Sequence, residues 1–598
     1  MKSVSTLFFI SLVPFVAKAQ ETLIAPMLES DSVCESAIKK GITNAYDAKN
    51  YCQAIDETPA SLIEKKLSTF GPKKSSDGKF EIGYVLTLPL LSFVDMKENG
   101  EFTINKKNIS YQLKTMKDSK LPVVIYLFSN HFSVSKGAKT EDMIANLDRK
   151  NLMQFSNGNI PIDNYFAGKT YPWAINASDS LIDKIRQASL KEILTQICDM
   201  DNSNKNKIRA MTVLGDVHFT FPNFLDGMGY KEKIQLTDYS PESVKRFRNY
   251  LVKKYEKIVN LNNKFGSQFE SFEDINLPSK DINTDHLNNF FEHLNYESSG
   301  KLAIYGWAER TSNGPAKIKI FVDGVDAGYA DTGLNRIDVY QALPSLGTSA
   351  VGYRYYLDFR NMDHGIHSVD IVHENSDKLT LMKHLDISVM DRQQSTPKPV
   401  GKAVEFPIEE KIQFWNDYPE SLIAVYYNPL SEEFFNFREK EVTKEISKYS
   451  DIVSSSCIGK DKVFSHQIAP VFNGDWNEEK IAAADSLKKN SHYNLGFNTY
   501  GSAFYGDYTF QWLKKSEIKK YGLPEAHPML EDESVIKKAI LRHHNNGAVF
   551  MVPYYVELAP NTFEKDQNHA KFEIKDDNKQ YGSSQYFRAI RDVMNANY

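Results

Sequence analysis

The sequence predicts an α/β protein, a (β/α)8 TIM barrel with an inserted β-sandwich domain. Apolar runs of strand length alternate with segments of helical periodicity, which is typical of parallel α/β folds. Eight such runs are present, four on each side of residues 300–392, and eight repeats indicate a closed barrel. Residues 300–392 instead have short alternating runs separated by turn residues. A doubly wound open sheet is the alternative for the alternating part.

The first half of the barrel is predicted over residues 80–299. Leu and Ile side chains fall on one side of residues 178–200, which predicts a helix that Ser178 can cap. A second helix is expected to begin at Ser240 and to continue towards Leu261. The four apolar runs are 82–89, 121–128, 152–155 and 210–216. The third of them is short and leads into a long loop.

Residues 300–392 are predicted to form the inserted domain. One alternating run, 318–322, ends in Asp323-Gly324, which is a strong turn signal, and another run covers 367–372. Short strands at close spacing with turn residues between them favour a β-sandwich. A linker with two prolines follows at 395–399, as expected at a domain edge. Two roles fit such a domain, namely glycan binding and forming one wall of a cleft.

The second half of the barrel is predicted over residues 393–598. Helical spacing returns at 409–449. Helical segments also separate the strand candidates, as a (β/α)8 barrel requires, and they lie at 478–489, 510–521 and 533–545. The four strand candidates themselves are 463–470, 493–499, 522–527 and 548–555.

The N-terminus has the pattern of a secretory signal peptide over residues 1–19. Lys2 supplies a positive charge, Leu7–Val16 is an apolar stretch too short to span a bilayer, and Ala17-Lys18-Ala19 fits a cleavage site. No later segment has the roughly 18 uninterrupted apolar residues of a membrane helix. The mature chain, whose residues 20–79 form a polar leader, is therefore expected to be secreted or periplasmic. A retained N-terminal anchor is the alternative.

The four cysteines indicate one disulfide and no zinc site. Cys34 and Cys52 flank a short polar, partly helical stretch and are predicted to form a disulfide, which an exported protein can hold. Cys198 and Cys457 are predicted to be buried as small hydrophobic side chains, with pairing left open. No group of cysteines has the spacing of zinc ligands, so no metal is predicted.

Composition limits the classes of partner. The formal net charge is −5, and acidic and basic residues are interspersed, so no nucleic-acid partner is indicated. Aromatic residues make up 12% of the chain. Aromatic rings stack on sugar faces, but they also fill ordinary cores, so this composition permits a carbohydrate ligand without requiring one.

Polar residues at the predicted strand ends are the candidates for a functional site. In a (β/α)8 barrel all eight strands end at one mouth, where the active site lies. The apolar run that ends in Asp216 and the strand that contains Glu525 each place a carboxylate there. The other polar residues near strand ends are Asn130, His131, His218, His466, Gln467, Asn498, Tyr500, His527, Tyr554, Tyr555 and Glu557.

Two carboxylates across a pocket suit the cleavage of a glycosidic bond. One protonates the leaving oxygen, and the other attacks the anomeric carbon or activates water. Burial and neighbouring charges can give the two groups the different pKa values that these roles need. A separation of about 5–5.5 Å between the carboxyl groups would indicate retention of configuration, and roughly 6.5–9.5 Å would indicate inversion.

Several segments of the predicted barrel carry a family pattern. They are Leu214–Phe219 with Phe221-Pro222, Asp238–Ser240 with Phe247–Leu251, Lys254-Tyr255 with Leu261-Asn262 and Phe265-Gly266, and Asn498–Tyr500. These segments resemble clan-A glycoside hydrolases, and among them the family-42 β-galactosidase type of barrel. The resemblance covers the barrel and not the insert, and it implies that Asp216 is the acid/base and Glu525 the nucleophile. We expect substrate contacts from Asn130, His131, His218, Asn498, Tyr500, His527 and Tyr555.

The sequence departs from the family pattern at the fourth strand. The family has Asn-Glu there, whereas this chain has Gly215-Asp216. Asp is one methylene shorter than Glu, so the backbone or the substrate must bring its carboxyl group closer, and His218 could share the proton transfer. The missing Asn removes a usual contact to the sugar 2-hydroxyl, so either the substrate differs or the activity is reduced. Glu557 is a rival for the role of second carboxylate.

Three hypotheses follow. The first is an exported, retaining glycoside hydrolase that cleaves an oligo- or polysaccharide with Asp216 and Glu525 and needs no metal or organic cofactor. The second is a non-catalytic glycan-binding or adhesion protein on a degenerate barrel, which the Gly215-Asp216 departure motivates. The third is a metal-dependent hydrolase that uses His131, Asp216 and His218.

Overall fold

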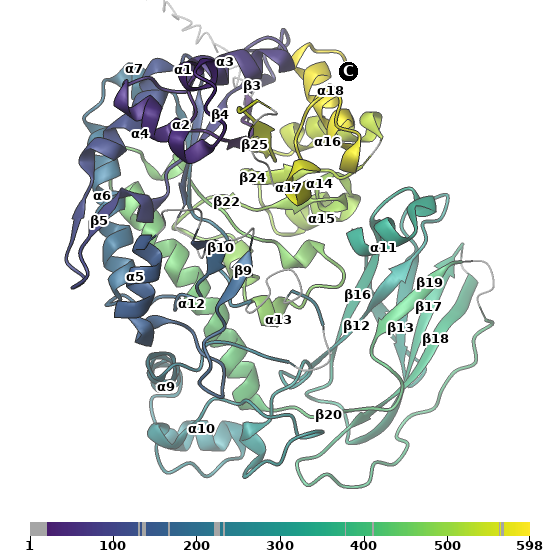
Figure 1. The fold of residues 1–598 in the computed structure, drawn as a ribbon. Coiled ribbons are helices and arrows are strands. Elements are labelled where there is room, and N and C mark those ends of the chain that lie inside the picture. Colours follow the sequence, from purple (N-terminus) through teal and green to yellow (C-terminus); the bar gives the residue numbers. More distant parts are fainter. Residues whose placement is uncertain are drawn as a thin grey trace, which may run out of the picture.

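The computed structural model of the protein describes most of residues 21–598. The ranges that it leaves out within that span are 129–131, 134–138, 166–167, 221–227, 231–233, 377, 409–411, 531, 561–562 and 564–566. The predicted signal peptide, the predicted contacts Asn130 and His131, and the Phe221-Pro222 pair therefore lie outside the described residues. In Figure 1 a helix-rich part with parallel strands fills the left and top, and a part made of antiparallel strands lies at the lower right.

The helix-rich part contains two parallel sheets. In the first the strand order is β21 (Val463–Ser465), β11 (Ile208–Leu214), β7 (Val123–Phe128) and β4 (Tyr84–Thr87). In the second the order is β22 (Leu495–Gly496), β24 (Tyr521–His527), β25 (Ala548–Pro553), β1 (Thr22–Ile24) and β3 (Phe80–Ile82), with β23 (Thr499–Tyr500) paired to β24. All of these pairs are parallel. Helices connect most of the strands, so the predicted α/β class is correct for this part of the chain.

The two sheets meet at both of their edges. Parallel bridges from Phe464 to Asn494 and from Gln467 to Phe497 join β21 to the chain around β22. At the other edge only Gly83 separates β3 from β4. The two parallel sheets are therefore bridged at one edge and continuous along the chain at the other.

Side chains on these strands alternate between two cores, as the pleat of a strand requires. One set comes from strands of both sheets and forms a single cluster, which includes Leu23, Val85, Val124, Tyr126, Ala210, Phe464 and Phe550. The neighbouring side chains belong to a larger cluster that the helices share, which includes Ile24, Tyr84, Leu86, Ile125, Met211 and Val213. The strands are thus buried on both faces, which explains why they read as continuous apolar runs.

One predicted strand is wrong, and another was missed. Leu152, in the predicted strand 152–155, makes only an isolated antiparallel bridge to Trp173 and joins neither parallel sheet. The parallel strand that was not predicted is β1, which pairs with β25 and β3. β1 lies in the stretch predicted to be a polar leader, because three residues are too few to give a strand signal on their own.

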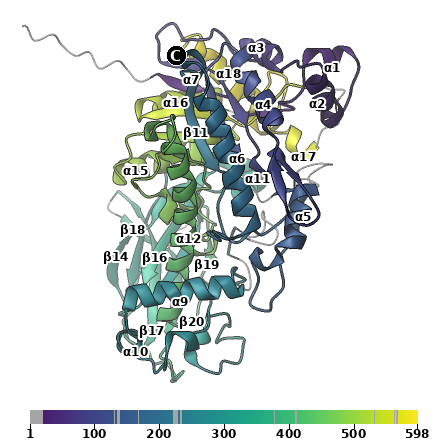
Figure 2. The ribbon, with the colours of Figure 1, turned by 90° about the vertical axis from the view of Figure 1, so that its left-hand side faces the viewer.

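Two long helices cover the outside of the first sheet. They are α6 (Leu181–Cys198) and α12 (Pro429–Ser454), which lie side by side in Figure 2 and contact each other. Ser180 caps α6, rather than the predicted Ser178, and its hydroxyl accepts a hydrogen bond from the Asp183 N–H. The helix predicted over 478–489 is only the single turn α13 (Glu478–Ile481).

The helix predicted from Ser240 is two helices. Ser240 caps α9 (Pro241–Tyr255) as expected, through a hydrogen bond from the Ser243 N–H. Glu256 then adopts a φ of 61°, which ends the helix, and α10 (Ile258–Phe265) follows. Near the C-terminus, α15 (Asp507–Lys515), α16 (Glu533–Asn545) and α18 (Ser583–Met594) pack outside the second sheet.

The part at the lower right of Figure 1 consists of two sheets whose strands are mostly antiparallel. One contains β15 (Asp331–Asn335), β16 (Ala350–Asp358), β12 (Lys301–Ala308) and β19 (Phe414–Tyr418). The other contains β14 (Val325–Tyr329), β13 (Lys317–Val322), β17 (Gly365–Asn375), β18 (Lys378–Val389) and β20 (Ile423–Val425). Buried residues of both sheets form one hydrophobic cluster. We call these two sheets, from β12 to β20, the module.

The module extends beyond residue 392, and the helical spacing predicted for residues 409–449 is wrong in its first part. β19 pairs antiparallel with β12, and β20 pairs parallel with β18. The helix α12 begins only at Pro429, which Asn428 caps. Pairing with distant strands decides the structure of residues 414–425, and a local periodicity does not contain that information.

The structure contains two disulfides. One joins Cys34 to Cys52, and the other joins Cys198 to Cys457. The prediction that Cys198 and Cys457 are buried is wrong, because Cys198 is only partly buried and Cys457 is exposed. The pairing that the sequence left open is present, since the two are bonded to each other. This second bond links the end of α6 to the chain just after α12, so proximity of the two helix ends explains a pairing that the separation in sequence hides.

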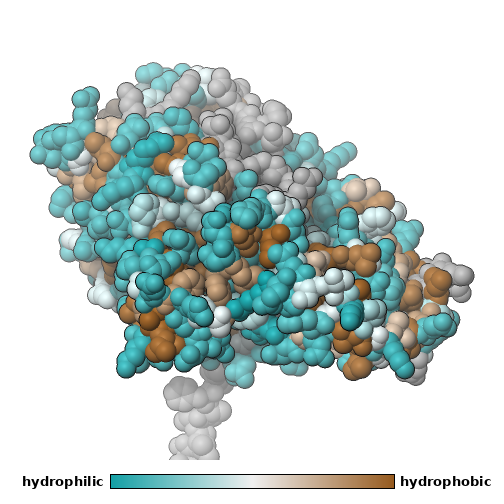
Figure 3. All heavy atoms as spheres, turned by 90° about the horizontal axis from the view of Figure 1, so that it is seen from below, coloured by the Kyte–Doolittle hydropathy of each residue, from teal (hydrophilic) through white to brown (hydrophobic). Residues whose placement is uncertain are grey.

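The surface is mixed in character. Figure 3 shows hydrophilic side chains over most of one face, with small hydrophobic groups scattered among them. Within the described ranges, none of the helices combines the length and the apolar character needed to cross a membrane.

Candidate functional site

The structure brings Asp216 and Glu525 together. Asp216 lies two residues beyond the end of β11, after a turn in which Leu214 and Gly215 have φ of 70° and 86°. Glu525 lies within β24. Asn498 connects them, because its Nδ2 donates to Asp216 Oδ1 at 3.0 Å and to Glu525 Oε2 at 3.3 Å. Two carboxylates that are 309 residues apart in sequence thus share one hydrogen-bond donor.

Both oxygens of Glu525 are held by neighbouring side chains. The Tyr500 hydroxyl donates to Glu525 Oε2 at 2.9 Å. On the other side, His466 Nε2 lies 3.3 Å from Glu525 Oε1. The Glu525 side chain remains 20% exposed, so it is fixed in position and still accessible.

The environment of Asp216 favours its protonated form. Burial raises the pKa of the Asp216 carboxyl well above its usual range, and the negative charge of Glu525 raises it further. A hydrogen bond from the Ile468 N–H opposes these effects only in part. The site therefore holds one carboxyl group that keeps its proton beside another carboxylate.

Tyr126 and His466 belong to this site, although neither was among the predicted substrate contacts. The Tyr126 ring stacks on the His466 ring, with centroids 4.3 Å apart. Burial and the charges of Glu525 and Asp216 raise the pKa of Tyr126 well above its usual value, so the phenol stays neutral. The sequence places His466 near a predicted strand end, which made it a candidate for the site. Tyr126 lies inside an apolar run, where nothing distinguishes it from a core residue.

His218 and His527 are buried and neutral. Burial lowers the pKa of each imidazole to about 3. His218 Nδ1 accepts a hydrogen bond from the Thr220 N–H at 3.0 Å. His527 Nε2 lies 3.2 Å from Ser583 Oγ, and its Nδ1 accepts from the Met529 N–H, so this ring is bound to the chain near α18. Both rings are therefore neutral at neutral pH, so neither acts as a general acid there.

Tyr555 and its neighbours line a second polar region beside Tyr500. The Tyr555 ring stacks on His569 with centroids 4.2 Å apart, and the Tyr554 hydroxyl lies 2.5 Å from His569 Nε2. Tyr554 in turn packs edge-on against Tyr500 at 6.0 Å. The ring of Tyr554 therefore lies between the predicted contact Tyr555 and Tyr500, which donates to Glu525.

Glu557, the rival for the second carboxylate, faces a different acid. It pairs with Glu29 in the register of β2 (Leu28–Glu29) and β26 (Val556–Glu557), and its Oε1 accepts a hydrogen bond from the Ala559 N–H at 2.8 Å. Burial, followed by the charge of Glu557, raises the pKa of Glu29 to about 8. Glu557 is thus engaged with β2 and its own loop.

In the part of the chain that the structure describes, no group of three or more His, Cys, Asp or Glu side chains is arranged to hold a metal ion. His131, which the metal-dependent hypothesis needs, lies outside the described residues.

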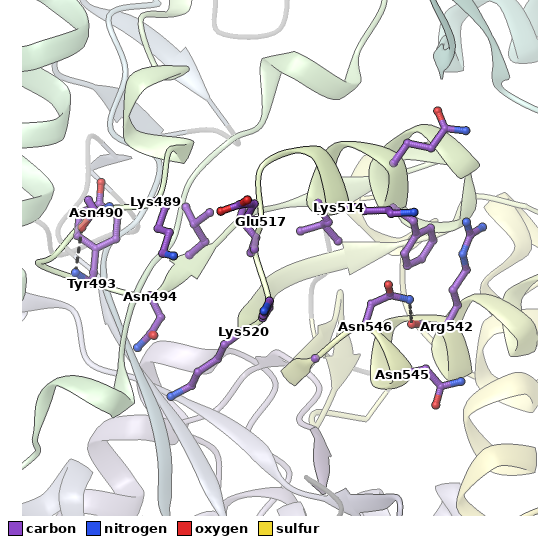
Figure 4. Close-up of a pocket in the computed structure, with 17 residues that line it drawn as sticks. Lys489, Asn490, Tyr493, Asn494, Lys514, Glu517, Lys520, Arg542, Asn545 and Asn546 are labelled. Atoms are coloured by element: carbon purple, nitrogen blue, oxygen red, sulfur yellow. Dashed lines mark hydrogen bonds between the residues drawn. The ribbon is translucent and has the colours of Figure 1, made fainter.

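Cavities do not mark the carboxylate pair. A hollow of about 940 Å³ lies near the beginnings of β22, β24 and β25, and none of the predicted site residues lines it. Figure 4 shows its mainly basic and amide lining, with Lys489, Lys520, Arg542 and Asn546 among the labelled residues. A much smaller cavity of about 50 Å³ touches Asp216 and His218. The hydrogen-bond network, rather than cavity size, identifies the site.

Comparison with known families gives one match. Residues 229–306 match glycoside hydrolase family 42, which is described as beta-galactosidase. This match confirms the resemblance to clan-A glycoside hydrolases and supports an enzyme of the glycosidase class. The matched segment runs from the chain before α9 into β12, so it contains neither Asp216 nor Glu525.

The other comparisons add little. A search of curated proteins finds no match. Among solved structures, the catalytic domain of beta-amylase from Paenibacillus polymyxa is similar, with 9% sequence identity, coverage of 97% of this chain and 100% of that chain, and a TM-score of 0.45. A likeness of this degree is too weak to assign a fold or an activity.

Proposed function

We propose that the protein is an exported, retaining glycoside hydrolase on a (β/α)8 barrel, with Asp216 as acid/base and Glu525 as nucleophile. The observation that carries the proposal is the single Asn498 amide that donates to both carboxylates. The family match to residues 229–306 supports the hydrolase class, and the carboxylate pair supports the residue roles. The substrate class is an oligo- or polysaccharide.

The environments of the two acids fit different roles. Asp216 keeps its proton through burial and the charge of Glu525, and it donates that proton to the leaving glycosidic oxygen. Glu525 then forms a bond to the anomeric carbon as the bond to the leaving oxygen breaks. In the second step Asp216 takes a proton from water, whose oxygen displaces Glu525 from the sugar.

Spacing favours retention over inversion. Asn498 Nδ2 lies 3.0 Å from Asp216 Oδ1 and 3.3 Å from Glu525 Oε2, so these oxygens are separated by no more than the sum of the two distances. This limit applies to one oxygen of each group, and it supports the close spacing of a retaining pair, whose carboxyl groups lie about 5–5.5 Å apart. The Asp216 side chain, although shorter than the Glu of the family pattern, reaches Asn498.

Export is supported by covalent chemistry as well as by the leader. Disulfides persist in oxidising compartments and are rare in the cytosol. The Cys34–Cys52 and Cys198–Cys457 bonds use all four cysteines. A periplasmic or secreted location fits both observations.

The proposal is tested with two substitutions and one control. Glu525→Gln should abolish hydrolysis of aryl glycosides, because an amide is not a nucleophile. An aryl β-galactoside is the first substrate to test, since the matched family is that of beta-galactosidase. Asp216→Asn should slow substrates with poor leaving groups far more than substrates with activated ones, since activated leaving groups need no proton. Glu557→Gln should leave turnover unchanged. Turnover that survives Glu525→Gln would rule out the assignment.

A further inference from the structure

We infer that the module holds residues of the proposed active site in position, and that its Asn335 is a positioning residue for Tyr500. This inference rests on the proposed function. It differs from both roles that the sequence left open for the inserted domain, since it assigns the module neither a glycan of its own nor a passive wall. The argument begins from the contacts between β15 and the turn that follows β23.

Asn335, at the end of β15, binds the turn that follows Tyr500. Asn335 Oδ1 accepts hydrogen bonds from the Ser502 N–H at 3.0 Å and from Ser502 Oγ at 3.2 Å. Ser349 Oγ, also in the module, accepts from the same Ser502 N–H at 2.9 Å. The N–H that begins α14 (Ser502–Tyr505) is therefore capped by the module and not by its own chain.

Gly501 allows this close approach. It has a φ of 57°, and a Cβ atom built on it would lie 2.5 Å from Asn335 Oδ1 and 3.0 Å from Ser349 Oγ. Any side chain here would push the module away from the turn. Gly501 directly follows Tyr500, whose hydroxyl donates to Glu525, so a shift of this turn displaces that hydroxyl.

The same asparagine also holds the chain on the other side of Glu525. Asn335 Nδ2 donates to Asn473 Oδ1 at 2.7 Å, and the Asn335 carbonyl accepts from the Gly474 N–H at 3.0 Å. Residues 470–477 follow the strand end that supplies His466 to Glu525 and the Ile468 N–H to Asp216. One module residue therefore contacts both loops that lead away from the partners of the carboxylate pair.

Arg354 of β16 strengthens the second of these contacts. Its guanidinium donates to the carbonyl oxygens of Asn473, Trp476 and Val471 at 2.9, 3.1 and 3.2 Å. Arg354 and Asn335 are each 3% exposed. Buried donors and acceptors that lose their partners destabilise the folded chain, so these hydrogen bonds fix the positions of both loops.

The test compares four variants of the full-length protein. Asn335→Ala removes the acceptor for Ser502, and Ser349→Ala is a milder variant that removes only one acceptor. Arg392→Gln is the control, because Arg392 joins the module to α10 through the carbonyl oxygens of Phe265 and Gly266, far along the chain from the carboxylates. Tyr500→Phe removes the hydroxyl through which Asn335 is inferred to act. Thermal unfolding establishes that each variant is folded.

The kinetic readout is a double-mutant cycle. Asn335→Ala should lower kcat about tenfold with little change in KM, because a small misplacement of a catalytic contact slows the reaction more than it weakens binding. In the Tyr500→Phe background the same substitution should change kcat less than twofold. Ser349→Ala should show a smaller effect of the same kind, and Arg392→Gln none. A full tenfold loss that persists without the Tyr500 hydroxyl would overturn the inference.

The second readout does not depend on glycosidase activity. Hydrogen exchange of residues 498–506 should become faster in Asn335→Ala and Ser349→Ala, since the Ser502 N–H loses acceptors, and should stay unchanged in Arg392→Gln. If the wild-type protein hydrolyses no glycoside, the proposed function fails, and exchange alone decides whether the module holds this turn. Unchanged exchange in Asn335→Ala would overturn the inference even for an active enzyme.

Discussion

At the scale of single residues, the departure from the family pattern at Gly215 has a physical reason in the structure. Gly215 has a φ of 86°, and a Cβ atom on it would overlap the hydroxyl oxygen of Tyr126. Any side chain at position 215 would therefore meet the Tyr126 hydroxyl in this chain. The Tyr126 hydroxyl therefore requires a residue without a side chain at position 215.

This pairing predicts a specific rescue. Gly215→Ala should lower the free energy of unfolding by about 1–3 kcal/mol and reduce turnover, since it strains the backbone and displaces Tyr126 from His466. Adding Tyr126→Phe should restore part of the stability, because the ring carbon that bore the hydroxyl lies 3.5 Å from the built Cβ, an ordinary contact distance. Chemical denaturation of both variants measures this. Equal stability of the single and double variants would contradict the pairing.

The sequence located part of this site and missed the rest for an identifiable reason. Asp216, Glu525, Asn498 and Tyr500 could be proposed because strand ends of a barrel converge, which is a rule of topology. The stacking of Tyr126 on His466 depends on which face of each strand points inward and on the spacing between strands. Neither quantity can be read from a single run of residues.

At the scale of elements, the errors fall where long-range pairing decides the structure. β1 is only three residues long and becomes a strand because β25 and β3 lie on either side of it. β19 and β20 form because β12 and β18 offer them edges. Helices with strong periodicity and caps behaved differently, and α16 has the same bounds as the predicted helix 533–545.

The disulfide between Cys198 and Cys457 should contribute more to stability than the one between Cys34 and Cys52. The two bonds close loops that span sequence separations of 259 and 18 residues. In the loop-entropy account the longer loop is worth about 5–6 kcal/mol and the shorter about 3 kcal/mol. Cys198→Ser/Cys457→Ser should therefore lower the free energy of unfolding more than Cys34→Ser/Cys52→Ser does. A larger loss from the short loop would contradict this.

At the scale of the whole molecule, folding places many carboxyl groups in surroundings that disfavour their charge. Burial raises the pKa of Glu297 and Glu29 to about 8, and that of Glu479 and Glu439 to about 7. Glu297 lies before β12 and accepts a hydrogen bond from the Tyr418 hydroxyl of β19. The junction between the helix-rich part and the module thus contains a carboxyl group that is protonated in the folded chain at near-neutral pH.

These groups predict a loss of stability as pH rises. Between the ordinary glutamate pKa and about 8, the folded chain keeps the Glu297 proton and the unfolded chain has lost it, so rising pH favours unfolding. The buried neutral histidines act in the opposite direction only below their ordinary pKa, so the range from pH 6.5 to 8 isolates the acids.

The free energy of unfolding should therefore fall between pH 6.5 and 8, by about 1–2 kcal/mol for each glutamate whose pKa is about 8. Glu297→Gln cannot titrate and can still accept the Tyr418 hydrogen bond, so it should remove one such contribution and flatten the profile. Glu101→Gln, at an exposed position, should leave the slope unchanged. Denaturant unfolding at several pH values in this range measures all three proteins. A Glu297→Gln profile as steep as that of the wild type would show that this carboxyl is already ionised in the folded chain.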